Sequence, residues 1–421
     1  MENKQNILIV CFSFPSFPGI GGRRWAKFAK HLAKNNFNVH VLAAENTSNK
    51  TSAWINDVRD KKIKITTFPL GLSKVFSFYP ANFFEKLIYK ILTIGAKLFI
   101  KGNKQDKIWF VKDTLLREAD KLISINKINT LIVTIPPYKL AYYLLPLKKK
   151  YPGLKFCVDY RDPWTDNRSY HGFANISSSD LAAESEFEKQ VLLAADVVLD
   201  VNQQSLELLK KKIFTEASFV HLPNGFDNDD YEFTASSTPP SDIVRFVYTG
   251  SFYPNLIYLL KPLVNTLKKL EASHPDLYKR LSFDLYGNMD HKAIEELKNS
   301  NCSAIKFHGD VPQKEVHEKI SQADFCLLFS AQDHHHALNT KFYEYLYFRK
   351  PILYFGNKGH ASDYITTNGI GFLFEPKELE DSFYYFLINN DLKEFTSNPD
   401  VDIHSFEVGH ITKTLIKAIN G

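Results

Sequence analysis

The sequence has few cysteines and no long apolar run. The four cysteines among its 421 residues are far apart and form no C-x-x-C pair, which argues against a zinc ribbon or a thioredoxin-type site. We expect them to be buried thiols of a protein in a reducing compartment. The apolar run at 7–12 is too short for a signal peptide or a membrane span. The sequence therefore predicts a cytoplasmic protein.

A strong excess of one charge is also absent. The chain has 52 Lys and Arg residues against 47 Asp and Glu residues, for a net charge of +5. This mild excess suits an anionic substrate or a membrane surface, but it is too small to indicate a nucleic-acid partner. Internal repeats and low-complexity segments are absent as well. The composition is that of an ordinary globular protein.

The length and the order of the expected elements predict two domains. Apolar strands alternate with amphipathic helices twice, and a polar stretch rich in Pro and Ser, 229–241, separates the two series. This pattern predicts an α/β protein with two Rossmann-like, doubly wound domains that face a central cleft. We expect an N-terminal domain at 1–235 and a C-terminal domain at 236–404. A last helix within 405–421 is expected to pack back on the first domain.

A loop rich in glycine follows the first expected strand. Gly21 and Gly22 precede a helix and allow close approach of the backbone to a ligand. The loop is not G-x-G-x-x-G, and no ribose-binding acid ends the second strand, so an NAD site is weakly supported. The alternative is a tight turn that needs glycine for its own geometry.

A short helix beginning near Asn339 carries one base and one acid. Lys341 and Glu344 are three residues apart, so they share a helix face. A cation at a helix start suits a phosphate, because unpaired N–H groups point there too. The spacing predicts that Lys341 holds a diphosphate and that Glu344 binds the ribose. The alternative is an ordinary ion pair on the surface of the helix.

Charged residues also follow the expected strand at 154–160. Asp159, Arg161 and Asp162 lie at its carboxyl end, which is where open α/β sheets bind ligands. These residues are candidates for catalysis. The alternative is that Arg and Asp brace a loop around a buried Trp164.

The segment 83–107 is dense in apolar residues and interleaved with lysines. A basic amphipathic helix of this kind can lie on an anionic membrane surface. The alternative is a core helix whose lysines are solvated.

Six short motifs, in this order, resemble those of retaining glycosyltransferases of the GT-B fold, family 4 (glycosyl transferases group 1). The resemblance runs nearly from end to end. The motifs are Phe14-Pro15 with Gly19 to Arg24, Asp159 to Trp164, Pro223 to Asp227, Tyr248-Thr249-Gly250, Phe307-His308-Gly309, and Lys341 to Tyr345 with Lys350-Pro351.

The resemblance implies a nucleotide-sugar donor, with UDP-sugars favoured, bound mainly by the C-terminal half. It implies that the N-terminal half holds the acceptor, which we expect to be a growing surface polysaccharide or a lipid-linked glycan. Transfer is expected to retain the anomeric configuration and to need no metal or other cofactor. A metal at the three histidines 334–336 is disfavoured, because adjacent residues rarely bind one ion together.

The resemblance also assigns residues to the site. In the family, two acids eight residues apart mark the donor site; here Glu344 matches the second, and His336 stands in place of the first. Asp162 or Asp159, beside Arg161, is expected to activate or orient the acceptor, and Arg23 or Arg24 to contact the acceptor or a phosphate. The donor residues are expected to be Gly21, Gly22, Gly250, Ser251, Val311, His336, Lys341 and Glu344.

Two other functions remain open from the sequence. A sugar-nucleotide epimerase or hydrolase also uses two such halves, and a non-catalytic GT-B scaffold would tolerate the loss of an acid at His336. The first base after Gly250 is Lys261, which also fits a scaffold, since the family usually has Arg and Lys soon after that glycine. We expect a cytoplasmic protein, peripheral on the inner face of the cell membrane through 83–107, with no nucleic-acid partner.

Overall fold

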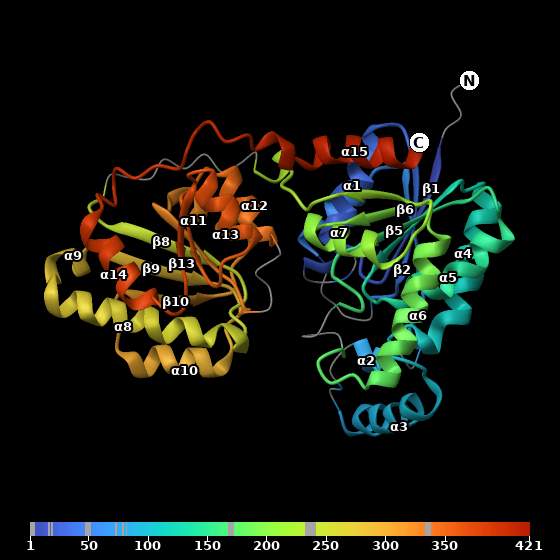
Figure 1. Cartoon of the computed structure of the whole chain (residues 1–421), viewed down its shortest axis with the longest axis horizontal. Helices are drawn as coiled ribbons and strands as arrows, with labels where there is room; N and C mark the ends of the chain where they lie inside the picture. The colour runs from blue at the N-terminus through green and yellow to red at the C-terminus, as the bar shows by residue number, and fades with distance from the viewer. Residues whose placement is uncertain are drawn as a thin grey trace. The chain divides into compact units, whose positions relative to one another are not determined.

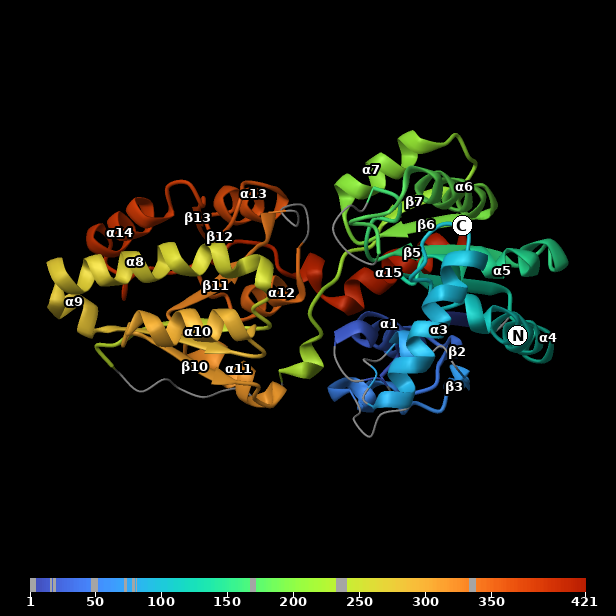
Figure 2. The same ribbon diagram turned by 90° about the horizontal axis from the view of Figure 1, so that it is seen from below.

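The chain forms two compact units. In the computed structural model, unit 1 contains residues 1–223 and 408–421, and unit 2 contains residues 224–407. Each unit is a parallel sheet covered by helices on both faces (Figures 1 and 2). The structure describes residues 5–15, 17, 20–46, 52–71, 74–77, 80, 82–166, 172–231, 241–332 and 338–421.

Unit 1 is built on a seven-stranded sheet in the order β3-β2-β1-β4-β5-β6-β7. All neighbouring strands in it are parallel. The strand order reverses between β1 and β4, and the carboxyl ends at such a switch point are where open sheets bind ligands. The strands are β1 (Asn6–Cys11), β2 (Asn38–Ala44), β3 (Ile63–Phe68), β4 (Thr130–Ile135), β5 (Lys155–Tyr160), β6 (Val197–Asp200) and β7 (Ser218–His221).

The two faces of this sheet carry two separate cores. In β1, Leu8 and Val10 point into one core, whereas Ile7 and Ile9 point into the other. This alternation follows from the two-residue repeat of a strand. The first core is covered by α4 (Lys112–Asn126), α5 (Lys139–Lys150), α6 (Ser178–Ala194) and α7 (Gln203–Lys212), and the second by α1 (Arg23–Lys34) and α15 (Val408–Asn420).

Helix α3 (Phe83–Phe99) lies outside these layers. It projects at one end of unit 1 in Figure 1, and it lies in front of the sheet in Figure 2, which is seen from below. Ala96 is its one buried residue. The short helix α2 (Lys74–Ser77) precedes it. Among the described residues, no helix combines the length and apolar character needed to cross a membrane.

Unit 2 is built on a six-stranded parallel sheet in the order β10-β9-β8-β11-β12-β13. Its switch point lies between β8 and β11. The strands are β8 (Val244–Thr249), β9 (Leu281–Tyr286), β10 (Ile305–Gly309), β11 (Phe325–Phe329), β12 (Ile352–Phe355) and β13 (Gly371–Phe374). One face is covered by α8 (Ile257–Ser273), α10 (His291–Ser300) and α14 (Leu379–Asn389), the other by α11 (Gln313–Gln322), α12 (Thr340–Tyr347) and α13 (His360–Thr367); α9 (Pro275–Lys279) follows α8.

Stacked phenylalanines fill the core of unit 2. The register pairs Phe246 of β8 with Phe283 of β9 and with Phe325 of β11. Their ring centres are 4.3 Å and 5.2 Å from that of Phe246, and the rings are nearly parallel. Because parallel strands bring equivalent positions side by side, one phenylalanine per strand forms a continuous apolar layer.

The α/β class with two doubly wound sheets, predicted from the sequence, is confirmed. The second unit begins at Asn224, earlier than the expected residue 236. The reason is packing: the N–H of Phe226 donates to the Phe406 carbonyl at 3.0 Å, and Tyr231 stacks on Tyr347 with ring centres 3.8 Å apart. Most of the expected linker, 232–240, lies outside the described residues. All four cysteines are buried and unpaired, as expected.

Candidate functional site

In unit 2, the loops that follow β8 and β9 are in direct backbone contact at the carboxyl edge of the sheet. Gly250 follows β8 and Gly287 follows β9, and the N–H of Gly250 donates to the Tyr286 carbonyl at 2.8 Å. A Cβ at Gly287 would lie 2.6 Å from the Gly250 carbonyl oxygen. The φ angle of Gly287, +112°, is also one that favours glycine. These loops therefore pack closely beside the switch point, where a side chain would block them.

Lys341, in the first turn of α12, lies directly over Gly250. A Cβ at Gly250 would overlap Cε of this lysine, and the Lys341 Nζ is 5.4 Å from the centre of the Tyr248 ring. Burial lowers the pKa of the Lys341 ammonium. No carboxylate of the described residues lies within ion-pairing distance of Nζ, so the alternative of a surface ion pair with Glu344 is wrong. The Glu344 carboxylate, beyond ion-pairing distance, opposes this lowering of the pKa in part.

Glu344 lies one turn further along α12 and faces α11. It is 8% exposed, and its Oε1 accepts a hydrogen bond of 3.3 Å from Gln313 Nε2. Gln313 is also 2.9 Å from His317 Nε2. The helix is capped by Asn339, whose Oδ1 accepts from the Phe342 N–H at 3.1 Å. The cap and these neighbours hold the carboxylate in one place near the cation.

The other residues expected to bind the donor have ordinary surroundings. Ser251 is half-buried, and its carbonyl accepts from the Tyr248 hydroxyl at 2.8 Å. Val311 follows β10 and packs against the core on the α11 face. His336 lies outside the described residues.

A polar group on β9 and β10 was not predicted. His308 Nε2 is 2.6 Å from Asp284 Oδ1, and the His308 ring stacks on Tyr286 with centres 4.6 Å apart. All three line a cavity of about 650 Å³. The motif Phe307-His308-Gly309 contains one of these residues. The partners are on the neighbouring strand, so only the strand register could have identified them.

In unit 1, Asp159 and Arg24 form a buried ion pair. Asp159 at the end of β5 has no exposed surface, and its Oδ1 accepts from Arg24 Nη2 at 2.7 Å. Its Oδ2 accepts from Trp25 Nε1 at 2.7 Å and from the Thr134 hydroxyl at 2.8 Å. Arg24 also donates to the Leu222 and Pro223 carbonyls, at 2.7 Å and 3.0 Å. The contacts are those of a structural anchor, and none of them tests the catalytic role predicted for Asp159.

Arg161 stabilises the same edge of the sheet through hydrogen bonds to backbone carbonyls. Its guanidinium donates to the Gly21 carbonyl at 2.8 Å, to the Pro136 carbonyl, and to the Ile135 carbonyl at 3.4 Å. The alternative in which Arg161 helps hold a loop around a buried tryptophan is supported in this respect, because Trp164 is fully buried. Asp162 follows directly and is half-buried.

The glycine-rich loop is shaped by packing within unit 1. A Cβ at Gly22 would lie 2.8 Å from the backbone carbon of Phe14. Gly21 is exposed, and its carbonyl accepts from Arg161. Arg23 is buried, with its guanidinium carbon 5.9 Å from the Trp54 ring centre. The tight-turn alternative accounts for Gly22, and the predicted ligand contacts of this loop stay predictions.

A cavity of about 370 Å³ lies at the switch point of unit 1. Of the three residues predicted to be catalytic, Arg161 lines it, whereas Asp159 and Asp162 do not. Three residues of its polar wall, Asp106, Lys139 and Glu184, were not predicted from the sequence. Lys139 Nζ lies 3.1 Å from Glu184 and 3.5 Å from Asp106. The three residues are tens of positions apart in the sequence, so no motif marks them.

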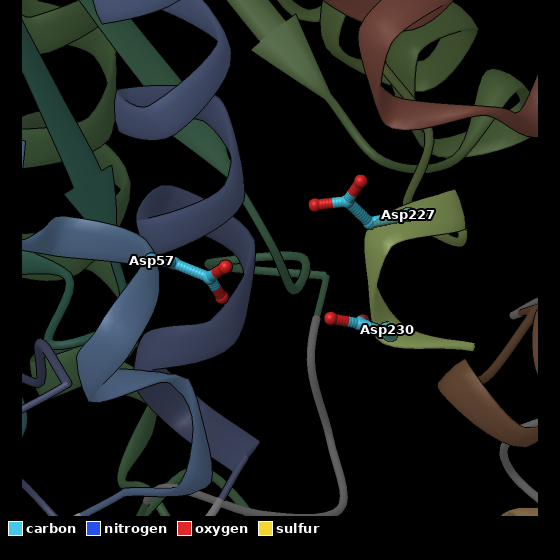
Figure 3. A group of neighbouring side chains, drawn as sticks. All are labelled: Asp57, Asp227 and Asp230. Carbon is cyan, nitrogen blue, oxygen red and sulfur yellow. The ribbon is translucent and has the colours of Figure 1, made fainter. Parts of the chain in front are cut away.

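Figure 3 shows three aspartates, Asp57, Asp227 and Asp230, whose residue type would suit a metal ion. Asp230 ends a short 3-10 helix of unit 2 (Asn228–Asp230), and its N–H donates to the carbonyl of the N-cap residue, Asp227, at 2.9 Å. Asp57 belongs to unit 1 and pairs with Lys27 at 2.8 Å and Lys30 at 3.3 Å. Because the three carboxylates come from different units, we assign no common metal to them.

Comparison with known proteins identifies the fold. No family model and no curated protein matches the chain, but solved structures match it over nearly its whole length. Sucrose-phosphate synthase from Thermosynechococcus elongatus has 13% identity and a TM-score of 0.62, with 99% of this chain and 98% of that chain covered. HepE from Anabaena in complex with UDP-glucose has 14% identity and a TM-score of 0.61, with 99% of both chains covered. The α,α-trehalose 6-phosphate synthase from Burkholderia multivorans has 11% identity and a TM-score of 0.63, with coverage of 99% and 96%.

The chain has the GT-B fold. The GT-B fold expected from the six motifs is thereby confirmed, whereas membership of family 4 and retention stay predictions. Among the described candidate residues, Lys341 lies over Gly250, which follows β8 at the switch point of unit 2, and Arg161 lines the cavity at the switch point of unit 1. Lys341 and Glu344 belong to unit 2, and Arg24, Asp159 and Arg161 to unit 1.

Replacing Asp159 by alanine is expected to lower the free energy of unfolding of unit 1 by about 3–5 kcal/mol, because it leaves the buried Arg24 guanidinium unpaired. All four tryptophans lie in unit 1, so urea unfolding followed by tryptophan fluorescence measures this unit. Asp120→Ala is the control, since Asp120 forms an exposed ion pair with Lys150, and its cost should stay below about 1 kcal/mol. Equal costs for the two variants would contradict the anchor role.

The stability of unit 1 should also depend on pH through Asp200. Burial raises the pKa of this carboxyl to about 7, and its Oδ2 has no hydrogen-bond partner among the described residues. Because the folded state binds the proton more tightly than the unfolded state, stability is lost as pH rises from about 4 to 7. The loss amounts to at most about 1.4 kcal/mol per pH unit for one group. Asp200→Asn should remove this part of the slope in fluorescence-detected unfolding, and identical pH profiles for both proteins would contradict the assignment.

Proposed function

We propose that the protein is a glycosyltransferase that moves a sugar from a nucleotide-sugar donor, with UDP-sugars favoured, to a growing surface polysaccharide or lipid-linked glycan. The observation that carries this proposal is the Lys341 ammonium, which lies over Gly250 at the switch point of unit 2 without a carboxylate partner among the described residues. A nucleoside diphosphate suits such a cation. The GT-B structure of HepE in complex with UDP-glucose lends support.

The proposed roles follow from where each side chain lies. Lys341 stabilises the negative charge that develops on the diphosphate leaving group as the glycosidic bond breaks. Glu344 accepts hydrogen bonds from the ribose hydroxyls, and its long 3.3 Å contact with Gln313 is weak enough to be exchanged for them. Because a lysine supplies the cation, the proposed reaction needs no metal. We propose that it proceeds with retention, as the resemblance to family 4 implies.

Asp162 is our choice for the residue that orients or deprotonates the acceptor. Asp159 has no exposed surface and accepts from Arg24, Trp25 and Thr134, so an acceptor does not reach its carboxylate. The guanidinium of Arg161 is directed to backbone carbonyls. Asp162 follows β5 at the carboxyl edge and is half-buried, which fits a group that contacts a ligand there.

The exposed apolar face of α3 supports attachment to a membrane. Phe84, Leu87, Ile91, Ile94 and Leu98 recur at spacings of three and four, so they form one stripe along the helix. Large apolar side chains of this helix are 40–75% exposed. Exposed stripes of this size are rare on monomeric proteins and mark interaction surfaces. The full set is Phe83, Phe84, Leu87, Tyr89, Ile91, Ile94, Leu98 and Phe99.

The charges on α3 favour an anionic bilayer as its partner. Lys86, Lys90 and Lys97 are exposed and lie along one flank of the apolar stripe, since they too are spaced by four and seven. Glu85 is the one acid in the helix. A helix with an apolar face and a basic flank lies in the membrane interface with its axis in the plane. We therefore propose a cytoplasmic protein that is peripheral on the inner face of the cell membrane.

The donor site is tested by calorimetric titration of UDP and of uridine. Lys341→Met should weaken UDP binding about 10- to 100-fold, because it removes a charged contact to the diphosphate, and should leave uridine binding unchanged. Glu344→Gln should weaken both ligands, because both contain the ribose. Lys358→Met is the control, since that side chain is 70% exposed on the same unit.

The outcomes separate the three candidate functions. A wild-type protein that does not bind UDP would contradict the donor site. Slow hydrolysis of one UDP-sugar that gives way to faster transfer when a glycan acceptor is added would indicate a transferase, and a screen of sugar nucleotides would identify that sugar. Hydrolysis at a rate that no acceptor changes would indicate a hydrolase. Conversion of the sugar nucleotide to its epimer without release of UDP would indicate an epimerase. Binding without any turnover would indicate a scaffold.

Membrane attachment is tested by co-sedimentation with vesicles of phosphatidylcholine alone or with phosphatidylglycerol. The double variant Leu87→Gln, Ile94→Gln should lose binding to both, because each buried side chain contributes about 1.5–3 kcal/mol. Changing Lys86, Lys90 and Lys97 to Glu should abolish only the preference for phosphatidylglycerol, since each lysine contributes about 1 kcal/mol near an anionic surface. Phe214→Gln, at a side chain that is 92% exposed elsewhere on unit 1, is the control. Absence of wild-type binding, or equal binding by all variants, would exclude the proposed attachment.

A further inference from the structure

The cavity of about 370 Å³ at the switch point of unit 1 has the size of a ligand site. It lies where β1 and β4 end, since Phe12 and Ser13 follow β1 and Pro136 and Pro137 follow β4. Its third side is the loop 100–107, which comes directly after α3. The cavity is therefore formed within one unit, at the place where open sheets bind their ligands.

The two carboxylates in its wall are already satisfied. Glu184 Oε1 accepts from the Asn103 N–H at 2.7 Å and lies 3.1 Å from Lys139 Nζ, while Oε2 accepts from Trp164 Nε1 at 2.7 Å. Asp106 Oδ1 accepts from the Ile108 N–H at 2.9 Å, and Oδ2 from the Tyr143 hydroxyl at 2.6 Å. Lys139 is buried against both. Lys139 offsets one of the two negative charges, and the two further cations of the lining, Lys107 and Arg161, leave the cavity with a net charge of +1.

Lys107 is a cation of the cavity without such a partner. It is half-buried, and its Nζ lies 5.8 Å from the centre of the Phe12 ring. No carboxylate of the described residues lies within ion-pairing distance of it. Burial lowers the pKa of its ammonium, and an anion bound beside it would reverse that effect. Arg161 adds a second positive charge to the lining, because its partners are neutral carbonyls.

The loop that carries Lys107 is held firmly and begins at the exposed helix. Ile100 is buried, and its N–H donates to the Ala96 carbonyl of α3 at 3.0 Å. Asn103 Oδ1 accepts from the Gln105 N–H at 2.9 Å, and Lys139 Nζ donates to the Lys101 carbonyl at 2.7 Å. The loop therefore links the apolar face of α3 to the cavity through eight consecutive residues, 100–107, whose backbone is pinned by buried groups.

We propose that this cavity binds a phosphoryl group of a lipid-anchored acceptor, with the Lys107 ammonium contacting the phosphate oxygens. The proposal rests on the proposed function, and it specifies the acceptor class. The apolar part of the wall, Phe12, Pro136, Pro137 and Tyr138, contacts the first carbons of the lipid beside its phosphate. The bilayer on which α3 lies presents the lipid next to the loop that recognises its head.

The test is calorimetric titration of the full-length protein with geranyl phosphate, geraniol and inorganic phosphate. Lys107→Met should weaken binding of geranyl phosphate at least about tenfold, because it removes a charged contact. Lys107→Arg should restore most of the affinity, since it retains the charge. Lys101→Met is the control, because Lys101 is an exposed residue of the same loop that does not line the cavity. Equal thermal unfolding temperatures for all variants would show that the loop is intact.

Two results would overturn the proposal: equal binding of geranyl phosphate by wild type and Lys107→Met, or geraniol binding as tightly as its phosphate. Inorganic phosphate that binds as tightly as geranyl phosphate would contradict the lipid part and indicate a soluble phosphate ester instead. UDP binding is measured in the same samples and should not change in Lys107→Met. Loss of geranyl phosphate binding in Lys107→Met with normal UDP binding would support the role of this cavity. A wild-type protein that does not bind UDP would contradict the proposed function instead.

Discussion

The architecture of unit 1 depends on the buried ion pair between Arg24 and Asp159. A buried charge pair is stable only when the remaining hydrogen-bonding atoms are also satisfied. Here Trp25 and Thr134 complete the carboxylate, and the carbonyls after β7 complete the guanidinium. The pair thus joins the first helix to the carboxyl ends of three strands. The cavity loop 100–107 is held separately, by the hydrogen bonds from Asn103 to Glu184 and from Lys139 to the Lys101 carbonyl.

In unit 2, the loops at the carboxyl edge of the sheet are held together by close packing at glycines. Gly250 and Gly287 let two loops meet through backbone, and the space over Gly250 is filled by the stem of Lys341. Each unit has a half-buried ammonium, Lys341 or Lys107, that forms no ion pair with a described carboxylate and lies at or beside the switch point of its sheet. A desolvated cation is costly unless an anion joins it. This shared feature is the physical basis for the phosphate site that we propose in each unit.

The parts that the sequence predicted well are those set by local pattern. Apolar runs became strands, and the helix expected near Asn339 begins there with its cap formed. For the charged residues at strand ends, the sequence predicted their location at the sheet edge, but not the residues with which they pair. Asp159 was expected at a ligand-binding edge and lies at that edge, yet its carboxylate is engaged by Arg24. The composition of 83–107 predicts an amphipathic membrane-binding segment, whereas the structure has a helix that ends at Phe99, followed by a loop that lines a cavity.

The class of fold, the two sheets and the strand ends that carry the candidate residues could be predicted from the sequence. Strand and helix periodicity is local, and the strand ends of a parallel sheet share one edge. The tertiary structure alone decided which charges are paired. Asp159 meets residue 24, Lys139 meets residues 106 and 184, and Lys341 meets Gly250, all across long separations in the chain. Sequence spacing carries no information about such contacts, since they arise only when separate strands and loops pack together. Whether a charged residue is a structural anchor or is left for a ligand is settled at that stage.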